Sequence, residues 1–387
     1  MLLDNPFTND RRVQREAETL VKNGFLVQLV CLKQSALLKE EIINGVEIIR
    51  LFDLSIFDPK KFSEHKKLAK YLTDNFEFDI VHAHDQTMLN IGAKIKKLKK
   101  TILIYDSHEL FHSWPLNSSN YDSKLLHLKS LLVRKWFIFR ESKNKKHIDF
   151  LITVNNSIAK NLENYLKINS SKISVLRNTP EYSSPAEKST ILRDHFNIPE
   201  NQKILVFIGA NIYLNSLNME QVFEEFEPRK DIAIVVIAAF NDHSNQIKEY
   251  VKANNYTNIY FHDKINHEVI NSYLASADVG LVPTWNKKDL SYWYALDNKL
   301  FEYLQAGIPI LATSQPEYQL IVENLKIGVC VNPDIKNDYL NGFLQILENY
   351  DQYKQNATET SKELCWENEQ KILTTFYNAI KLQNQEE

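Results

Sequence analysis

The sequence predicts an α/β fold of two Rossmann-like, doubly wound domains with a ligand cleft between them. Short apolar runs alternate with longer amphipathic segments along nearly the whole chain, which is the pattern of a parallel sheet covered by helices. The chain has 387 residues, too many for one ordinary core and suitable for two. A loop rich in proline and serine, residues 178–189, separates two such series. Ligands of such folds bind at the carboxyl ends of the strands, so we expect the cleft there.

The first domain is expected to comprise residues 1–178. Only Met1 to Leu3 precede its first loop, so either the first strand is abbreviated or the true start lies upstream. A helix is expected over residues 14–23, closed by Gly24. The remaining apolar runs predict strands at residues 26–32, 46–51, 80–83, 101–105, 150–154 and 173–176.

The second domain is expected to comprise residues 179–366, with a last helix from residue 367 to the end of the chain, after Trp366. Its apolar runs have the length and composition of buried strands. They predict strands at residues 204–208, 232–237, 259–261, 279–283, 309–312 and 328–331.

Composition excludes several classes of function. The net charge is −3, so no overall basic field argues for nucleic acid as a partner. The three cysteines, Cys31, Cys330 and Cys365, lie far apart in the sequence without metal-ligand spacing, which argues against a zinc site or a disulfide scaffold. No signal peptide is visible and no apolar run reaches membrane-spanning length. We therefore expect a cytoplasmic protein.

Polar residues follow two neighbouring strands of the first domain. Residues 82–85 read His-Ala-His-Asp and residues 106–109 read Asp-Ser-His-Glu, so both sets should project from the same edge of the sheet. Imidazole and carboxylate groups there can orient hydroxyls and stabilise developing charge. Two histidines this close could suggest a metal ion, but no third ligand with suitable spacing follows, and we expect no metal. For His84 and His108 the alternative is a hydrogen-bonded structural histidine.

A short helix followed by a buried strand is expected at residues 297–312. Asp297 can cap the helix start, and Gly307 lies where a left-handed C-cap is wanted. The helix N-terminus suits a phosphate, because its N–H groups lack partners and carry partial positive charge. Glu302 lies more than one turn further along, where it could accept hydrogen bonds from sugar hydroxyls. Gly209 ends a strand, where the backbone can approach a phosphate closely.

These segments resemble the retaining glycosyltransferases of the GT-B fold, family 4 (glycosyltransferase group 1). That family often carries Pro-Asn-Lys-Leu-x-Glu-Tyr followed by Ala-Gly-x-Pro. Residues 297–303 read Asp-Asn-Lys-Leu-Phe-Glu-Tyr, and residues 306–309 read Ala-Gly-Ile-Pro. The Asp-Ser-His-Glu segment also resembles that of the family, whose histidine contacts the donor sugar. Residues 10–13, Asp-Arg-Arg-Val, resemble the family's Asp-x-Arg-Val; the alternative there is a helix start with arginines facing water.

The resemblance implies a metal-independent hexosyltransferase without a cofactor, acting on a UDP- or GDP-sugar as substrate. The sugar would pass with retention to a saccharide or lipid-linked acceptor, in the assembly of bacterial surface polysaccharide. The last helix would pack back on the first domain. His108 would be the catalytic residue facing the sugar. The donor-binding residues would be Glu302 on the ribose and Lys299, Asn298, Leu296 and Gly209 near the phosphates. Candidate sugar or acceptor contacts are Asp10, Arg11, His84, Glu109 and Tyr294.

The chain departs from the family pattern in the second domain. An Arg and a Lys usually follow the first strand and grip the diphosphate, whereas residues 210–216 read Ala-Asn-Ile-Tyr-Leu-Asn-Ser. The first Glu of the family's Glu-x7-Glu pair is Tyr294, and its usual proline is Asp297. The diphosphate would rely on helix N–H groups and Lys299. Two alternatives therefore stay open: a catalytically impaired GT-B scaffold that binds a partner enzyme or glycan, and a sugar-nucleotide epimerase of the same fold.

A basic amphipathic segment covers residues 124–140. It mixes ten apolar residues with Lys129, Arg134, Lys135 and Arg140, and three further lysines follow, Lys143, Lys145 and Lys146. Such a helix could lie on an anionic membrane surface, at the inner face of the membrane, which would suit a lipid-linked acceptor. Its apolar face looks too wide for a surface helix alone, so we favour a core helix with a solvated basic rim.

Overall fold

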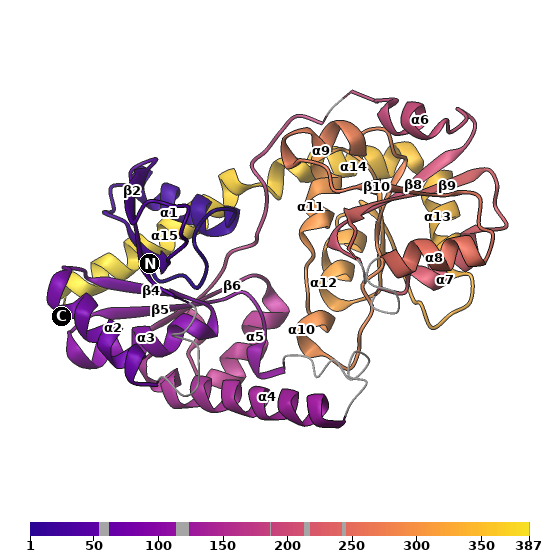
Figure 1. The fold of residues 1–387 in the computed structure, drawn as a ribbon. Coiled ribbons are helices and arrows are strands. Elements are labelled where there is room, and N and C mark those ends of the chain that lie inside the picture. Colours follow the sequence, from indigo (N-terminus) through magenta and orange to yellow (C-terminus); the bar gives the residue numbers. More distant parts are fainter. Residues whose placement is uncertain (54–61, 114–123, 186, 213–216, 242–244, 387) are drawn as a thin grey trace. The chain divides into compact units, whose positions relative to one another are not determined.

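The computed structural model (Figure 1) describes residues 1–53, 62–113, 124–185, 187–212, 217–241 and 245–386. The chain divides into two compact units. Unit 1 contains Met1–Asn178, Asp289–Ser291 and Glu369–Glu387, and unit 2 contains Thr179–Lys288 and Tyr292–Asn368. Both units are built on parallel strands with helices, which confirms the α/β fold class. Among the described residues, no helix is both long and apolar enough to cross a bilayer.

Unit 1 holds two sheets that the N-terminus joins. One sheet has the order β1-β3-β2 and the other the order β4-β5-β6-β7. Leu2 forms parallel bridges with both Val30 and Ala83, so the expected first strand is reduced to a bridging residue. The strands are β1 Gln28–Leu32, β2 Glu40–Ile43, β3 Val46–Phe52, β4 Ile80–His84, β5 Ile102–Ser107, β6 Phe150–Thr153 and β7 Ile173–Val175.

Strand β2 is absent from the sequence-based prediction, although its signal is present. It pairs antiparallel with β3 across a turn at Asn44 and Gly45. Both turn residues have positive φ, 49° and 82°. This is the Asn-Gly hairpin turn, whose backbone twist matches that of the flanking strands. The polar, exposed character of β2 hides it from a search for apolar runs, whereas the turn reveals it.

The helices of unit 1 include one that comes from the end of the chain. They are α1 Arg11–Lys22, α2 Phe62–Asn75, α3 Asp85–Leu98, α4 Lys124–Asn144, α5 Asn156–Leu166 and α15 Trp366–Glu386. Figure 1 shows α15, in yellow, beside the indigo and violet elements of the N-terminal half. Phe376 of α15 packs edge-on against Phe150, with the ring centroids 5.7 Å apart. The Tyr377 hydroxyl of the same helix lies 2.7 Å from Nδ1 of His82.

Helix α1 begins three residues earlier than the sequence predicts. The Asp10 side chain accepts a hydrogen bond from the Val13 N–H at 3.1 Å and so caps the helix before Arg11. Because Arg12 therefore lies within the helix, it shares a buried face with Glu16, four residues further along. The two arginines of the Asp-Arg-Arg-Val segment therefore separate: Arg11 is exposed and Arg12 is buried.

Unit 2 is a single six-stranded parallel sheet of order β10-β9-β8-β11-β12-β13. Its strands are β8 Lys203–Asn211, β9 Ile232–Ala239, β10 Ile259–Asp263, β11 Val279–Val282, β12 Ile310–Thr313 and β13 Gly328–Val331. Along β8, Val206 belongs to one buried apolar cluster and Phe207 to another. Both faces of the sheet are therefore covered, as a doubly wound domain requires.

Helices cover both faces of this sheet. They are α6 Ile191–Phe196, α7 Met219–Phe226, α8 Asn245–Ala253, α9 His267–Leu274, α11 Asn298–Gln305, α12 Pro316–Tyr318, α13 Asp338–Glu348 and α14 Tyr350–Glu363. The short helix α10 Leu290–Trp293 is divided between the two units, with Leu290 and Ser291 in unit 1 and the rest in unit 2. Helix α11 approaches β11 closely, because a Cβ at Gly280 would lie 2.4 Å from the Tyr303 ring. The Tyr303 hydroxyl donates to the Leu281 carbonyl and accepts from the Ile208 N–H, each at 3.1 Å. These contacts fix α11 against the centre of the sheet.

Candidate active site

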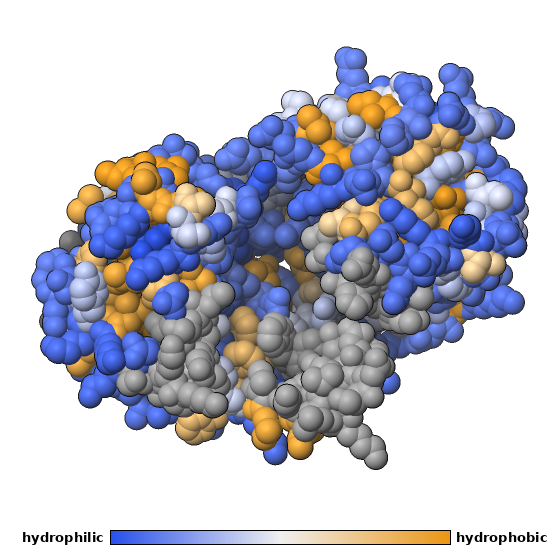
Figure 2. All heavy atoms as spheres, in the orientation of Figure 1, coloured by the Kyte–Doolittle hydropathy of each residue, from blue (hydrophilic) through white to orange (hydrophobic). Residues whose placement is uncertain are grey.

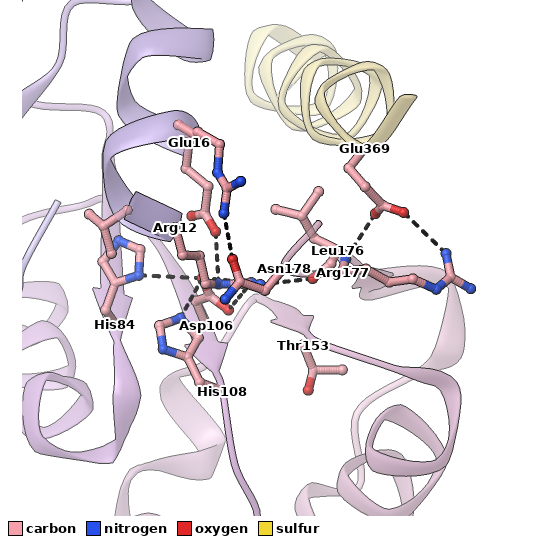
Figure 3. A network of polar contacts seen from close by, with 12 residues as sticks. Arg12, Glu16, His84, Asp106, His108, Thr153, Leu176, Arg177, Asn178 and Glu369 are labelled. Atoms are coloured by element: carbon pink, nitrogen blue, oxygen red, sulfur yellow. Dashed lines mark hydrogen bonds and ion pairs between the residues drawn. The ribbon is translucent and has the colours of Figure 1, made fainter. Parts of the chain in front are cut away.

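Polar side chains gather at the carboxyl ends of β4 and β5 in unit 1. His84 lies opposite Asp106 in the parallel ladder of these two strands. Figure 3 shows His84, Asp106 and His108 close together beside Arg12 and Glu16 of α1. The two strand ends that the sequence singles out therefore share one cluster.

Asp106 is the centre of this cluster and is fully buried. Nη2 of Arg12 donates to its two carboxylate oxygens at 3.2 and 3.4 Å. Oδ2 of Asp106 also lies 3.2 Å from Nε2 of His108 and 3.4 Å from Nε2 of His82. Burial alone would raise the pKa of Asp106, but the charges of Arg12 and His108 hold it well below its usual range. Asp106 is therefore an anion surrounded by donors.

His108 lies between two carboxylates. Its Nδ1 is 3.1 Å from Oδ2 of Asp85, and its Nε2 is 3.2 Å from Oδ2 of Asp106. Burial would lower the pKa of His108, but the two carboxylates outweigh burial and raise it well above its ordinary value. The ring is thus an imidazolium at neutral pH, with both N–H groups directed to carboxylates. Its side chain keeps 21% exposure, so its charge can act on an anion that binds beside it.

Asp85 holds His108 from a strained position. Its φ is 59°, in the left-handed region that few residues other than glycine adopt. Its Oδ1 accepts a hydrogen bond from the His108 backbone N–H at 3.1 Å, so one carboxylate grips both the backbone and the ring. Such strain costs of order 1–3 kcal/mol and collects at functional sites. It supports a functional rather than a purely structural histidine.

Arg12 and Glu16 of α1 pack against the cluster around Asp106. Nε of Arg12 lies 3.0 Å from Oε1 of Glu16, and its Nη1 donates to the Leu176 carbonyl at 2.9 Å. Burial and the nearby Asp106 raise the pKa of Glu16 to about 8, although Arg12 opposes the shift. At neutral pH Glu16 therefore holds its proton, and the charge of Arg12 is balanced chiefly by Asp106.

His82 and His84 are buried and neutral. Their rings stack with centroids 4.2 Å apart. Burial lowers the pKa of both histidines, and His82 lowers that of His84 further, to about 3. Nδ1 of His84 lies 3.3 Å from Oδ2 of Asp106, yet neither ring nitrogen has a well-oriented hydrogen bond within the part of the chain that the structure describes. His84 is therefore a packed ring beside the cluster, and a contact of His84 with sugar stays a prediction.

Although no third ligand with suitable spacing follows the two histidines in the sequence, the fold brings two further candidate ligand residues beside them. One ligand atom from each of Glu16, His82, His84 and Asp106 lies within 4.8 Å of the others. The additional carboxylates come from α1 and β5, which sequence spacing could not bring together. However, Arg12 lies in the same cluster, where it forms an ion pair with Asp106 and contacts Glu16 at 3.0 Å. A divalent cation would compete with this buried guanidinium, so the donor set fits an arginine-centred ion network better than a metal.

The other residues proposed for unit 1 lie at its surface or support it. Asp10 is half-buried, caps α1 and accepts a hydrogen bond from Asn5 at 2.8 Å. Arg11 and Glu109 are exposed. The sequence reasoning gave no separate role to Arg12 and Glu16. The Arg-x3-Glu spacing on one helix was the available signal, because it places both side chains on one face.

The residues proposed for donor binding in unit 2 lie around the N-terminus of α11. Leu296 and Tyr294 are half-buried just before the helix, Asn298 is exposed, and Lys299 and Glu302 are half-buried. The Lys299 ammonium lies 5.2 Å from the centroid of the Phe207 ring on β8. These residues therefore gather where α11 meets the carboxyl end of β8.

Asp297 is the N-cap residue of α11, but it does not cap as the sequence predicts. Its side chain makes no cap hydrogen bond within the described chain. Its Oδ2 instead accepts from the Thr284 hydroxyl at 2.8 Å and from the Lys299 ammonium at 2.7 Å. Burial would raise the pKa of Asp297, but Lys299 outweighs it and the pKa is lowered. The N–H groups of the first turn therefore receive no hydrogen bond acceptor from the Asp297 side chain. The carboxylate of Asp297 instead pairs with the Lys299 ammonium.

Glu302 and Gly209 complete this group. Oε1 of Glu302 lies 3.8 Å from Nε2 of His267, the first residue of α9, and its side chain is 24% exposed. Gly209 pairs with Ala238, and the register of β8 shifts directly after it, as at a β-bulge that re-aims the backbone. The rest of the loop where the family carries its Arg and Lys, residues 213–216, lies outside the described residues.

Comparisons with known proteins give the same class for both halves of the chain. The family model Glycosyltransferase Family 4 matches residues 10–179, and the model Glycosyl transferases group 1 matches residues 202–349. No curated protein matches the chain.

Solved structures similar to this chain share its fold at low identity. Sucrose-phosphate synthase from Thermosynechococcus elongatus has a TM-score of 0.78 at 16% identity, covering 99% of each chain. HepE of Anabaena in complex with UDP-glucose has a TM-score of 0.68 at 12% identity, covering 98% of this chain and 99% of its own. WaaG, a glycosyltransferase involved in lipopolysaccharide biosynthesis, has a TM-score of 0.67 at 15% identity, covering 97% of this chain and 99% of its own.

Proposed function

Because the chain belongs to the GT-B glycosyltransferases of group 1, family 4, we propose that it transfers a hexose, with retention, from a nucleotide sugar to a saccharide or lipid-linked acceptor. The observation that carries the proposal is the start of α11. The N-terminus of this helix has no side-chain cap among the described residues. Lys299 lies in its first turn, and the carboxylate of Glu302 follows just beyond it. This set matches the phosphates and ribose of a nucleotide diphosphate.

Each part of the donor has a partner of fitting chemistry in unit 2. Phosphate oxygens accept hydrogen bonds from the first N–H groups of α11, whose partial positive charge favours anions. Lys299 would exchange Asp297 for the diphosphate. Ribose hydroxyls would donate to the carboxylate of Glu302. HepE has been solved with UDP-glucose, which supports a UDP-sugar as the first donor to try, with GDP-sugars as the alternative.

In unit 1 we assign the chemical role to His108. When the bond between the anomeric carbon and the diphosphate oxygen breaks, its electron pair goes to the diphosphate, and the sugar gains positive character. A fixed imidazolium stabilises the negative charge on the leaving group without needing to reorient. The acceptor hydroxyl then forms the new bond to the anomeric carbon, and its proton passes to the departing diphosphate oxygen. Asp85 and Asp106 hold His108 charged and oriented throughout.

Independence from a divalent metal is part of the proposal. Each unit supplies positive charge that supports it, unit 1 through His108 and unit 2 through Lys299 and the α11 N-terminus, because a cation or a helix N-terminus can neutralise phosphate charge. Turnover should therefore persist after treatment with EDTA and should not depend on added Mg²⁺ or Mn²⁺. A cytoplasmic location and a place in bacterial surface polysaccharide assembly belong to the same proposal.

One observation favours a second function, a GT-B scaffold that binds a partner enzyme or glycan without transferring sugar. The ammonium of Lys299 is already bound by Asp297, and residues 210–216 contain neither Arg nor Lys. The diphosphate therefore has fewer cationic partners than the family usually provides. The cationic His108, held by the strained Asp85, opposes this alternative, because a scaffold has no use for such a site.

A donor panel separates the two functions. The purified protein is incubated with UDP- and GDP-hexoses, and free nucleotide is measured with and without saccharide and lipid-linked acceptors. The proposal expects nucleotide release from at least one donor that rises when an acceptor is present, with the product keeping the donor's anomeric configuration. Nucleotide binding without release from any donor would support the scaffold instead.

A further inference from the structure

Helix α4 packs on unit 1 through one of its faces. Arg140, Glu141 and Asn144 are buried on that face. The Asn144 side chain donates to Asn90 of α3 at 3.2 Å, and Arg140 donates to the Thr87 carbonyl of the same helix at 3.2 Å. The expected core helix is therefore observed on this side, which already satisfies the packing needs of unit 1.

The opposite face of α4 carries a second apolar stripe that points outward. Leu128, Leu132 and Phe139 are 53%, 59% and 58% exposed. Their spacing places them on one side of the helix, together with the exposed Lys135 and Lys143. Figure 2 shows hydrophobic residues reaching the surface along the lower edge, where α4 lies in Figure 1. We call these five residues the outer face of α4. The apolar pattern of this segment is wide because the helix has apolar residues on two faces rather than one.

This region is strongly basic in an acidic chain. Residues 124–147 contain eight Lys and Arg residues and one acidic residue, Glu141, whereas the whole chain has a net charge of −3. Glu141 is buried and lies 2.9 Å from the Tyr105 hydroxyl, so it does not screen the outer face. Among the described residues, the ammonium of Lys143 lies 5.6 Å from the centroid of the Phe139 ring rather than beside a carboxylate, and Lys135 and Lys146 are exposed.

Basic residues of the neighbouring helices extend the positive surface. Lys66 of α2 and Lys97 of α3 are exposed. Burial, and then repulsion from Lys97, Lys143, Arg140 and Lys66, lower the pKa of Lys94. These cations are thus close enough to destabilise one another. A solvated basic rim would be expected to interleave carboxylates, whereas this surface concentrates one sign of charge.

We propose that the outer face of α4 binds the surface of an anionic lipid bilayer. Leu128, Leu132 and Phe139 would enter the boundary between headgroups and acyl chains, and the lysines would contact lipid phosphates. Apolar side chains on one face of a helix with flanking lysines are what interfacial binding requires. Each basic residue near an anionic surface adds to the binding free energy. The inference is independent of the transfer reaction.

Charge decides between lipid and the other occupants of this face. A second copy of the chain, related by a two-fold axis, would bring the same basic surface against itself. Repulsion between the two sets of lysines would oppose the apolar gain. An extended anionic surface instead satisfies the lysines of α2, α3 and α4 together, without requiring a matching shape.

Vesicle co-sedimentation tests the proposal with the full chain. Vesicles of phosphatidylcholine are compared with vesicles that also contain phosphatidylglycerol, at low and high salt. The wild-type protein should bind the anionic vesicles, and high salt should weaken this binding. Changing Leu128, Leu132 and Phe139 together to Ser should reduce binding roughly tenfold or more. Changing Lys135, Lys143 and Lys146 to Glu should abolish the preference for anionic vesicles.

Two matched variants control for general loss of apolar surface or charge. One changes three exposed apolar residues elsewhere, Leu26, Ile42 and Ile335, to Ser. The other changes three exposed lysines elsewhere, Lys160, Lys188 and Lys252, to Glu. Both should bind anionic vesicles like the wild type. Circular dichroism and nucleotide affinity, which should not change in the α4 variants, show that each protein is folded.

Four results would overturn the proposal: no binding of the wild type to anionic vesicles, equal binding to neutral ones, unchanged binding of the α4 variants, or an equal loss in the matched controls. A wild-type dimer that the α4 apolar variant dissociates would assign the face to a second copy instead. A protein that binds vesicles but releases nucleotide from no donor would keep this inference and refute the proposed function.

Discussion

Arg11 and Arg12 are adjacent in the sequence and occupy opposite environments. Arg12 is buried and shared between Asp106, Glu16 and the Leu176 carbonyl, whereas Arg11 is exposed. Removing one partner of a buried ion pair leaves an uncompensated charge and costs about 3–5 kcal/mol. We predict that Arg12→Ala lowers the free energy of unfolding by an amount in this range.

Arg11→Ala is the matched control, since it removes the same side chain one position away. Urea denaturation of both variants, followed by circular dichroism, measures the difference. Equal effects of the two substitutions would show that the buried network does not stabilise unit 1.

The protonation of Glu16 predicts how stability depends on pH. Burial and Asp106 raise the pKa of Glu16 from 4.5 to about 8. A raised pKa means that the folded state holds a proton that the unfolded state releases. The stabilisation from this group is therefore fully present below pH 4.5 and is lost as the pH rises through about 8. Glu16→Gln mimics the protonated form, so it should flatten the decline of stability across this window.

Urea unfolding of the wild type and of Glu16→Gln at several pH values tests this prediction. The two proteins should have similar stability at the acidic end, and the variant should be more stable at the alkaline end. Parallel curves for the two proteins would mean that Glu16 is ionised in the native state, as its ion pair with Arg12 alone would suggest.

At the scale of elements, helix α11 carries the donor-site hypothesis. Glu302→Ala removes the proposed partner of the ribose, and an unpaired polar partner typically costs about 1–3 kcal/mol, or roughly one to two powers of ten in affinity. We predict this loss for UDP or GDP in calorimetry, with the fold intact. Glu268→Ala, an exposed residue of the first turn of α9, is the matched control. Unchanged affinity of Glu302→Ala for every nucleotide tested would leave Glu302 as an ordinary helix residue.

A substitution of Asp297 tests whether its ion pair with Lys299 weakens nucleotide binding at α11. The family usually has proline at this position, and here the carboxylate binds Lys299 at 2.7 Å. Asp297→Pro would free the ammonium and supply a residue that lacks a competing charge. We predict tighter nucleotide binding, by about tenfold, as expected for one charge-assisted contact of about 1.5 kcal/mol. Calorimetry should also show that this gain disappears when Lys299 is changed to Met; a gain that survives in the double variant would exclude release of Lys299 as its cause.

The elements were largely predictable from sequence and the side-chain cluster was not. Buried parallel strands such as β9 are continuous apolar runs, which sequence reveals directly. Strand β2 is exposed and has no apolar run to reveal it, and α1 begins before its apolar pattern because Asp10 caps it. Glu16 and Asp106 meet although they are far apart in sequence, and only the packing of α1 on β5 brings them together. The cap expected from Asp297 failed because Thr284 and Lys299 compete for its carboxylate.

At the scale of the whole molecule, the proposed functions are divided between the units. Nucleotide affinity is assigned to unit 2 through Glu302 and Lys299, and stabilisation of the leaving group to unit 1 through His108. The two properties should therefore be separable by substitution. A substitution of His108 in unit 1 should lower turnover and leave nucleotide affinity unchanged. Glu302→Ala in unit 2 should lower nucleotide affinity.

The rate of sugar transfer by His108→Ala, measured beside its affinity for nucleotide, tests the central claim most directly. The account predicts that turnover falls by roughly two powers of ten or more, as it does when one preorganised stabilising group is lost. Nucleotide affinity should stay within error of the wild type. A His108→Ala protein that is destabilised but fully active would contradict the account, and so would a wild type that releases nucleotide from no donor.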